Sequence, residues 1–262
     1  MNELKTDAPK KPKRHRKRRR ALLILAAVLL LAAAATWLYL RDYYHAEPEA
    51  AEAIAHPAEG VTVRHLDGRI DFVPEDPVAG LIFYPGAKVE YTAYAPLMEA
   101  CAERGVLCVL LEMPGNLAVL DRNAADGVAA DYPQITRWYV GGHSLGGNIA
   151  ATYASKHADT LEGVVLLAAY ATHDLTGTEL RVLSVYGTED GVLNRDRYDS
   201  NRENLPTGTV EVVIDGGCHS YFGSYGMQKG DGSPTIPRAE QIARTADAIQ
   251  SLVAADALAS AA

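Results

Sequence analysis

A short run of small residues around one serine most constrains the fold of this chain. The run Gly142-His143-Ser144-Leu145-Gly146-Gly147 follows the apolar residues 138–140 and opens a segment with helical periodicity. A strand, a tight turn and a helix in succession leave no room for large side chains beside the serine. They also expose the Ser144 hydroxyl at the tip of the turn, next to the positive end of a helix. Because the pattern is short and such turns also occur as plain connections, its meaning depends on residues elsewhere in the chain.

Apolar strand patterns alternate with helical patterns from Gly60 to Ala262. The strand patterns cover residues 61–66, 69–73, 80–84, 106–111, 137–140, 161–168, 181–186 and 209–214, and the helical patterns cover 91–104, 123–131, 145–157 and 237–254. This alternation predicts an α/β domain with a mostly parallel sheet and helices on both faces. The turn signal Asp67-Gly68 predicts an N-terminal β-hairpin.

Two ionisable residues, an aspartate and then a histidine, follow later strands of the chain. Asp190 lies after the strand at 181–186, and His219 lies in a Gly-rich loop after the strand at 209–214. A serine hydroxyl needs a base to take its proton, and the base needs a carboxylate to orient it. We therefore predict a catalytic triad of Ser144, Asp190 and His219. The alternatives are Glu189 as the acid and, as the base, His143, His157 or His173.

Backbone amides are expected to complete this site. The N–H of Leu145 directly follows the serine, and the N–H of Ala87 lies in the loop Pro85-Gly86-Ala87-Lys88, so we expect these two amides to form an oxyanion hole. Because Ser144 holds the nucleophile position, Cys218 is not expected to be catalytic. The sequence has no metal-ligand cluster, phosphate loop or dinucleotide fingerprint, so no metal and no cofactor are expected.

Five sequence blocks extend the pattern over the whole domain. They are Phe83–Val89, Met113–Ala118, Asn123–Asp126, Gly141–Gly147 and Gly217–Gly226. In these blocks the chain resembles the bacterial α/β-hydrolases, among them dienelactone-hydrolase-like and esterase-like serine hydrolases. The resemblance implies the α/β-hydrolase fold and its triad but no particular substrate. Only about ten residues separate Tyr170 from Arg181, so a helical cap is expected to be minimal or absent.

The N-terminal segment predicts a membrane anchor. Residues 1–20 contain ten Lys and Arg residues, and residues 21–40 are uncharged and almost wholly apolar. Twenty such residues in a helix span about 30 Å, the hydrocarbon thickness of a bilayer. We predict a basic cytoplasmic tail (1–20), a transmembrane anchor (21–40), a linker (41–59) and an extracytoplasmic domain (60–262). The alternative is a cleaved signal peptide and a secreted domain.

The negative charge of most of the chain excludes one class of ligand. The chain has a net charge of −8, although its first 20 residues carry ten basic and two acidic groups. The acidic remainder argues against nucleic acid as a ligand. We therefore predict a membrane-anchored serine hydrolase that acts on small or medium esters through an acyl-enzyme. An acyltransferase or thioesterase with the same triad, or a non-catalytic envelope protein on this scaffold, are the alternatives. The acyl and alcohol parts of the substrate and the oligomeric state stay open.

Overall fold

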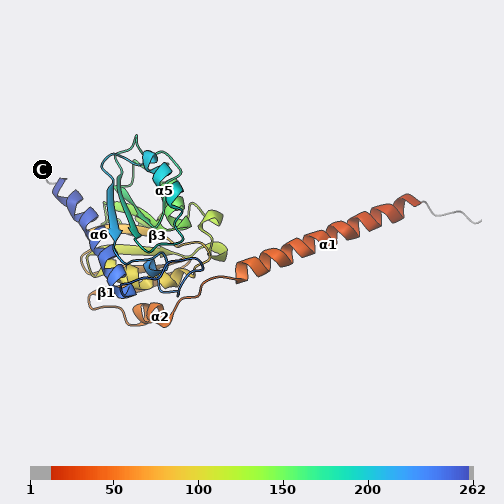
Figure 1. Cartoon of the computed structure of the whole chain (residues 1–262), viewed down its shortest axis with the longest axis horizontal. Helices are drawn as coiled ribbons and strands as arrows, with labels where there is room; N and C mark the ends of the chain where they lie inside the picture. Colours follow the sequence, from red (N-terminus) through yellow and green to blue (C-terminus); the bar gives the residue numbers. More distant parts are fainter. Residues whose placement is uncertain (1–12, 260–262) are drawn as a thin grey trace, which may run out of the picture. The chain divides into compact units, whose positions relative to one another are not determined.

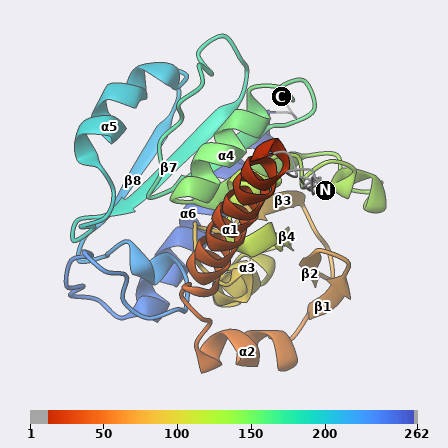
Figure 2. The ribbon, with the colours of Figure 1, turned by 90° about the vertical axis from the view of Figure 1, so that its right-hand side faces the viewer.

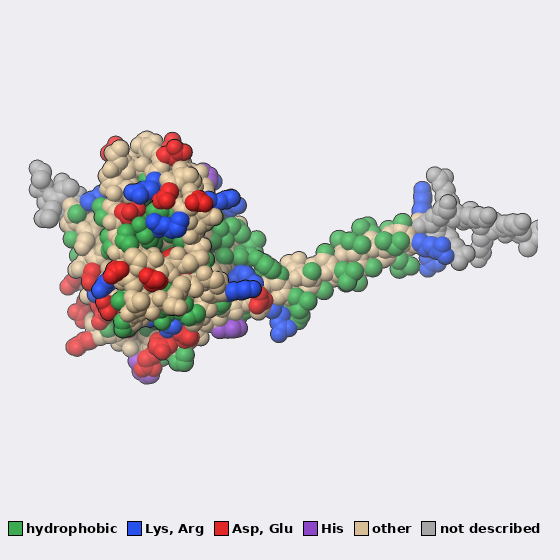
Figure 3. Space-filling view, in the orientation of Figure 1, with side chains coloured by type: hydrophobic (Ala, Val, Ile, Leu, Met, Phe, Trp, Pro, Cys, Tyr) green, Lys and Arg blue, Asp and Glu red, His purple; other side chains and the backbone are tan. Residues whose placement is uncertain are grey.

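The computed structural model describes residues 13–259 and divides the chain into two units between Asp42 and Tyr43. The first unit contains the helix α1 (Lys13–Arg41), which Figure 1 shows as one long element. Within α1, Arg18–Arg41 is exposed and is long and apolar enough to cross a membrane. Hydrophobic side chains cover much of its visible side in Figure 3. Residues 1–12 of the predicted basic tail lie outside the described residues.

The second unit is built on one eight-stranded sheet with the order β1-β2-β4-β3-β5-β6-β7-β8. Its first two strands form the predicted hairpin, β2 pairs antiparallel with β4, and all other neighbours are parallel. The strands are β1 (Val61–Leu66), β2 (Arg69–Pro74), β3 (Ala79–Tyr84), β4 (Val106–Leu111), β5 (Trp138–His143), β6 (Gly163–Leu167), β7 (Arg181–Gly187) and β8 (Val210–Ile214). The predicted α/β architecture is thereby confirmed.

Helices cover both faces of the sheet (Figure 2). The helices α3 (Ala95–Ala102) and α6 (Arg238–Ala259) pack on one face, and α4 (Leu145–Ala154) packs on the other. Because successive side chains of a strand point to opposite faces, β3 contributes Leu81 and Phe83 to the first core and Ile82 and Tyr84 to the second. The central strands are therefore apolar throughout, as their sequences predict.

Two of the predicted helices differ from the structure. The helix predicted at 123–131 is wrong, since only Val128–Asp131 forms a short 3₁₀ helix (η4) after turns. Gly127 precedes it in the left-handed region, with φ of 78°, which interrupts a regular helix. The segment predicted at 91–104 divides into a 3₁₀ helix, Tyr91–Tyr94 (η1), and α3, because Pro96 fits only the first turn of an α-helix.

The expected linker, residues 41–59, is not a free tether from Tyr43 onward. Tyr44 forms a parallel bridge with Val89: its N–H donates to Lys88 O at 2.7 Å, and its carbonyl accepts from Glu90 N–H at 2.9 Å. The short helix α2 (Pro48–Ala55) then buries Ala50 and Ala53. The docking therefore combines backbone hydrogen bonds with apolar packing, since Tyr44, Ala46 and Ile54 also lie against the core.

The connections after β6 and β7 shape the open end of the sheet. Residues 168–180, between β6 and β7, contain no helix, in agreement with the expected absence of a cap. After β7, a loop leads into the short helix α5 (Arg195–Ser200). The carboxyl ends of the parallel strands therefore open onto loops rather than onto a separate helical layer.

Candidate active site

Ser144 lies at the tip of the turn between β5 and α4, in a backbone conformation that non-glycine residues rarely adopt. Its φ and ψ are 54° and −121°. The flanking glycines are required by close approach, because a Cβ on Gly142 or Gly146 would lie 2.6 or 2.2 Å from the carbonyl oxygen of Tyr84. The Ser144 amide donates to Leu167 O at 2.9 Å, which fixes the turn against β6. The sequence pattern therefore produces a strained turn that presents a serine.

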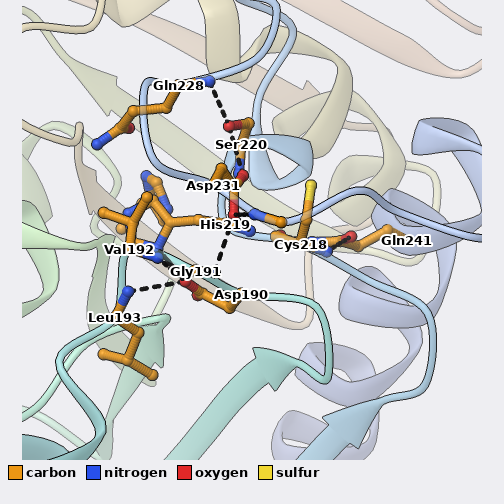
Figure 4. A network of polar contacts seen from close by, with 12 residues as sticks. Asp190, Gly191, Val192, Leu193, Cys218, His219, Ser220, Gln228, Asp231 and Gln241 are labelled. Atoms are coloured by element: carbon orange, nitrogen blue, oxygen red, sulfur yellow. Dashed lines mark hydrogen bonds and ion pairs between the residues drawn. The ribbon is translucent and has the colours of Figure 1, made fainter.

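Asp190 and His219 form a buried pair beyond β7 and β8 (Figure 4). His219 Nδ1 lies 2.9 and 3.1 Å from the two carboxylate oxygens of Asp190, and both side chains are 1% exposed. Asp190 Oδ1 also accepts the amide N–H groups of Val192 and Leu193 at 2.9 and 2.7 Å. These bonds fix the carboxylate so that it accepts from His219 Nδ1, which leaves Nε2 as the free ring nitrogen.

One cavity of about 380 Å³ contains the predicted nucleophile and base. Ser144, Leu145 and His219 line it, and the other lining residues are Asn148, Ala168, Ala169, Tyr170, Thr172, Val192, Leu193, Asn194 and Arg197. Within the described residues, His219 Nε2 is buried and has no hydrogen-bond partner, and no hydrogen bond joins it to Ser144. The structure therefore brings Ser144 and His219 to the same cavity, with Asp190 bonded to His219.

The alternative residues lie in other settings. Glu189 is exposed, and His173 Nδ1 lies 3.1 Å from Thr152 Oγ1. His143 is fully buried, and its ring centroid is 4.4 Å from that of His219. Burial, and secondarily the proximity of His219, hold the pKa of His143 well below the usual range of an imidazole. His143 is therefore a neutral neighbour of the base.

A second carboxylate, Asp231, organises the loops of the site and is not apparent from the sequence. Its Oδ1 accepts the amide N–H groups of Gly191 and His219 at 3.2 and 3.1 Å. Its Oδ2 accepts the amide and the hydroxyl of Ser220 at 2.7 and 2.6 Å (Figure 4). Burial raises the pKa of Asp231, but these hydrogen bonds outweigh burial and lower it overall. Asp231 thus connects the loop of Asp190 with the loop of His219.

The two predicted oxyanion amides are unpaired within the described part of the chain. Neither Leu145 N–H, at the start of α4, nor Ala87 N–H, after β3, has a hydrogen-bond acceptor there. Leu145 lines the cavity, whereas Ala87 is not among its lining residues. The loop of Ala87 is held at Gly86, whose N–H donates to Tyr94 Oη at 3.0 Å. Residues 13–259 hold no group of three metal-ligating side chains.

Cys218 precedes His219, and both polar groups of its backbone are bonded to one side chain. Its N–H donates to Gln241 Oε1 at 3.0 Å, and its carbonyl accepts from Gln241 Nε2 at 2.8 Å. Burial raises the pKa of the Cys218 thiol to about 12, so the thiol stays protonated at neutral pH. The side-chain amide of Gln241 on α6 therefore positions the backbone that carries His219, and the thiol does not.

Comparisons with known proteins agree with this architecture. No curated protein sequence matches the chain. Est1E from Butyrivibrio proteoclasticus is 16% identical, with a TM-score of 0.52 over 75% of this chain and 100% of the other. Dienelactone hydrolase from Anabaena variabilis is 14% identical, with a TM-score of 0.56 over 74% and 97%. An S-formylglutathione hydrolase from Agrobacterium tumefaciens is 14% identical, with a TM-score of 0.52 over 76% and 96%.

At these low sequence identities, the three structures show that the fold is shared. They carry no information about the substrate. The sequence match is more specific, because the profile of the alpha/beta hydrolase family covers residues 80–243. That range includes β3 from its second residue onward, the turn of Ser144 and the loops of Asp190 and His219. The chain therefore belongs to the α/β-hydrolase family.

Proposed function

We propose that the protein is a serine hydrolase that cleaves carboxylic esters through an acyl-enzyme on Ser144. The observation that carries this proposal concerns His219: its Nδ1 is bonded to Asp190, its buried Nε2 has no partner among residues 13–259, and Ser144 lines the same cavity. An imidazole that donates from Nδ1 to a carboxylate presents Nε2 as the atom that can accept a proton.

In the proposed reaction, His219 Nε2 takes the proton of the Ser144 hydroxyl as Oγ attacks the ester carbonyl. Asp190 stabilises the imidazolium that forms, because its carboxylate already accepts from Nδ1. The N–H groups of Leu145 and Ala87 stabilise the oxyanion. His219 then protonates the departing alkoxide, which leaves an acyl group on Oγ. A water molecule, deprotonated by His219, releases the acid and restores Ser144.

Fluorophosphonate labelling of the detergent-solubilised full chain tests this proposal. The wild type should be labelled at Ser144 and should hydrolyse short-chain esters, whereas Ser144→Ala should lose the label and about 10⁴-fold or more in kcat. Ser144 is half-buried at a turn, so its hydroxyl contributes little to the core, and the variant should keep the wild-type melting temperature. Unchanged turnover in Ser144→Ala would refute the assignment.

We further propose that α1 anchors the hydrolase unit on the outer side of the cytoplasmic membrane. The support is the apolar length of Arg18–Arg41 and the basic residues that precede and begin it. Alkaline carbonate extraction distinguishes an anchor from a cleaved signal sequence, since only an intact anchor keeps the hydrolase in the membrane fraction. Protease added to intact spheroplasts should digest residues 43–259 if this orientation is right.

A further inference from the structure

One charged side chain lines the cavity beside the nucleophile. Besides Ser144 and His219, the lining contains the apolar side chains of Leu145, Val192 and Leu193 and several polar residues. Among all the lining residues, Arg197 on α5 is the only one with a permanent charge. A cationic group in the substrate cavity is notable in a domain whose overall charge is strongly negative.

The two arginines nearest to Arg197 in the sequence, Arg195 and Arg202, interact with other side chains of the protein. The guanidinium of Arg195 lies over the rings of Tyr186 and Tyr198, at 4.0 and 4.9 Å from their centroids. Arg202 forms an ion pair with Glu211 at 3.5 Å. By contrast, the guanidinium of Arg197 has no ion-pair or hydrogen-bond partner among the described residues, and only its backbone is bonded. Arg197 therefore keeps its side-chain donors for a ligand.

Two asparagines of the cavity wall already form hydrogen bonds within the protein. Asn148 Nδ2 donates to Tyr170 O and Thr172 Oγ1, both at 3.0 Å. Asn194 Oδ1 accepts the backbone N–H of Arg197 at 2.9 Å and so caps α5. The amides of Asn148 and Asn194 therefore hold the cavity wall in shape, and the guanidinium remains as the charged donor that faces a bound molecule.

From this arrangement we propose that Arg197 binds an anionic group on the substrate, so that the enzyme prefers esters that carry a carboxylate over neutral esters. The inference rests on the proposed ester hydrolysis at Ser144. A guanidinium matches a carboxylate because two parallel N–H groups can donate to its two oxygens. The apolar side chains of Val192 and Leu193 line the same cavity and suit the carbon chain of such a substrate.

The experiment compares esters that differ only in charge, with the full chain in detergent. Monomethyl glutarate is paired with methyl 4-carbamoylbutanoate, which places the charge on the acyl side. Carboxymethyl butyrate is paired with carbamoylmethyl butyrate, which places it on the alcohol side. Each amide has nearly the shape of its carboxylate, so the ratio of the two kcat/KM values isolates recognition of charge.

We expect at least one pair to favour the anionic ester by about tenfold or more, as for a charge-assisted hydrogen bond. Arg197→Gln should lower that ratio at least about tenfold, and Arg197→Lys should keep part of it because it retains the charge but not the planar fork. Arg202→Gln is the matched control, since Arg202 is also exposed but lies outside the cavity, and it should leave the ratio unchanged.

A binding readout separates this inference from the proposed reaction. Glutarate should slow fluorophosphonate labelling of the wild type and should lose this effect in Arg197→Gln. If the wild type is labelled and hydrolyses neutral esters but neither pair shows a preference, the Arg197 inference is overturned while the proposed function stands. A preference that persists in Arg197→Gln also overturns it. Absence of both labelling and hydrolysis would instead overturn the proposed function.

Discussion

Tyr94 Oη lies 2.8 Å from His143 Nδ1, and both side chains are completely buried. The same hydroxyl accepts the amide N–H of Gly86 at 3.0 Å, so its own proton is directed to Nδ1. A neutral His143 that accepts at Nδ1 must carry its proton on Nε2. One phenol therefore fixes both the tautomer of the residue behind the base and the loop that carries the Ala87 amide.

We predict that Tyr94→Phe lowers both stability and kcat. The change removes the acceptor of Gly86 N–H and the donor to His143, and buried groups left unpaired cost about 1–3 kcal/mol each. Thermal melts and esterase kinetics measure the two effects. Tyr225→Phe is the control, because the buried Tyr225 hydroxyl has no hydrogen-bond partner in the described chain. Equal behaviour of the two variants would mean that the Tyr94 hydroxyl positions nothing.

Asp231→Asn should reduce kcat about 10- to 100-fold with little change in KM, because small displacements of reacting groups have large effects on rate. The variant replaces a carboxylate that accepts from both the Gly191 and His219 amides with a group that also donates. Asp215→Asn is the matched control, since Asp215 is exposed and follows β8 in the loop that leads to His219. A rate for Asp231→Asn equal to that of the control would contradict the positioning role.

The same variant makes a pH-dependent prediction. The pKa of Asp231 is lower in the folded chain than the ordinary 3.8, so its carboxylate stabilises the fold fully above that pH. The contribution is lost as the pH falls through the lowered folded value. The difference in unfolding free energy between wild type and Asp231→Asn should therefore be constant at neutral pH and shrink on acidification. Denaturant titrations at several pH values measure it.

Cys218→Ala should retain most activity. The thiol is buried and protonated, and Gln241 holds the backbone of this residue through its N–H and C=O groups, which alanine also has. Iodoacetamide at pH 8 should leave Cys218 unmodified in the native protein and modify it after unfolding, which peptide mapping would detect. Gln241→Ala, by contrast, should impair kcat, because it frees the loop that carries His219.

Truncation should separate the anchor from the segment that follows it. A chain that begins at Tyr43 keeps the contacts of Tyr44 with Lys88 and Glu90, whereas one that begins at Gly60 loses them and the bond of Glu47 N–H to Ser224 O. These three lost hydrogen bonds amount to about 3 kcal/mol, or a melting temperature about 10 °C lower. The shorter chain should also lose activity, because these contacts hold the segments beside Ala87 and after His219. Equal melting curves would show that residues 43–59 are dispensable.

The sequence predicts the central part of this site because steric and topological rules act there. Only glycine fits at Gly142 and Gly146, and the loops of Ser144, Asp190 and His219 follow parallel strands whose carboxyl ends share one edge. No such rule marks Asp231. It lies in an irregular Gly-rich segment, and most of its donors are backbone amides of distant loops, which have no sequence signature.

The sequence does not predict the docking of residues 43–59, for a related reason. A bridge such as Tyr44 with Val89 consists of backbone hydrogen bonds, and the apolar side chains that pack on the core after it, such as Ala53 and Ile54, are scattered among polar residues. The predicted helix at 123–131 failed through local context, since a glycine in the left-handed conformation ends the regular pattern there. Periodicity thus predicts the layers of the fold and not the loops that complete the site.

The uncapped connection between β6 and β7 determines which nucleophile an acyl group on Ser144 would meet. Residues 168–180 form no helical layer that would exclude water, so water should compete there with any other acceptor. An alcohol would outcompete water only if the cavity walls bound it. If the proposed acyl-enzyme forms, adding methanol to the assay should therefore yield methyl ester only in proportion to its concentration, because an uncapped rim favours transfer of the acyl group to water.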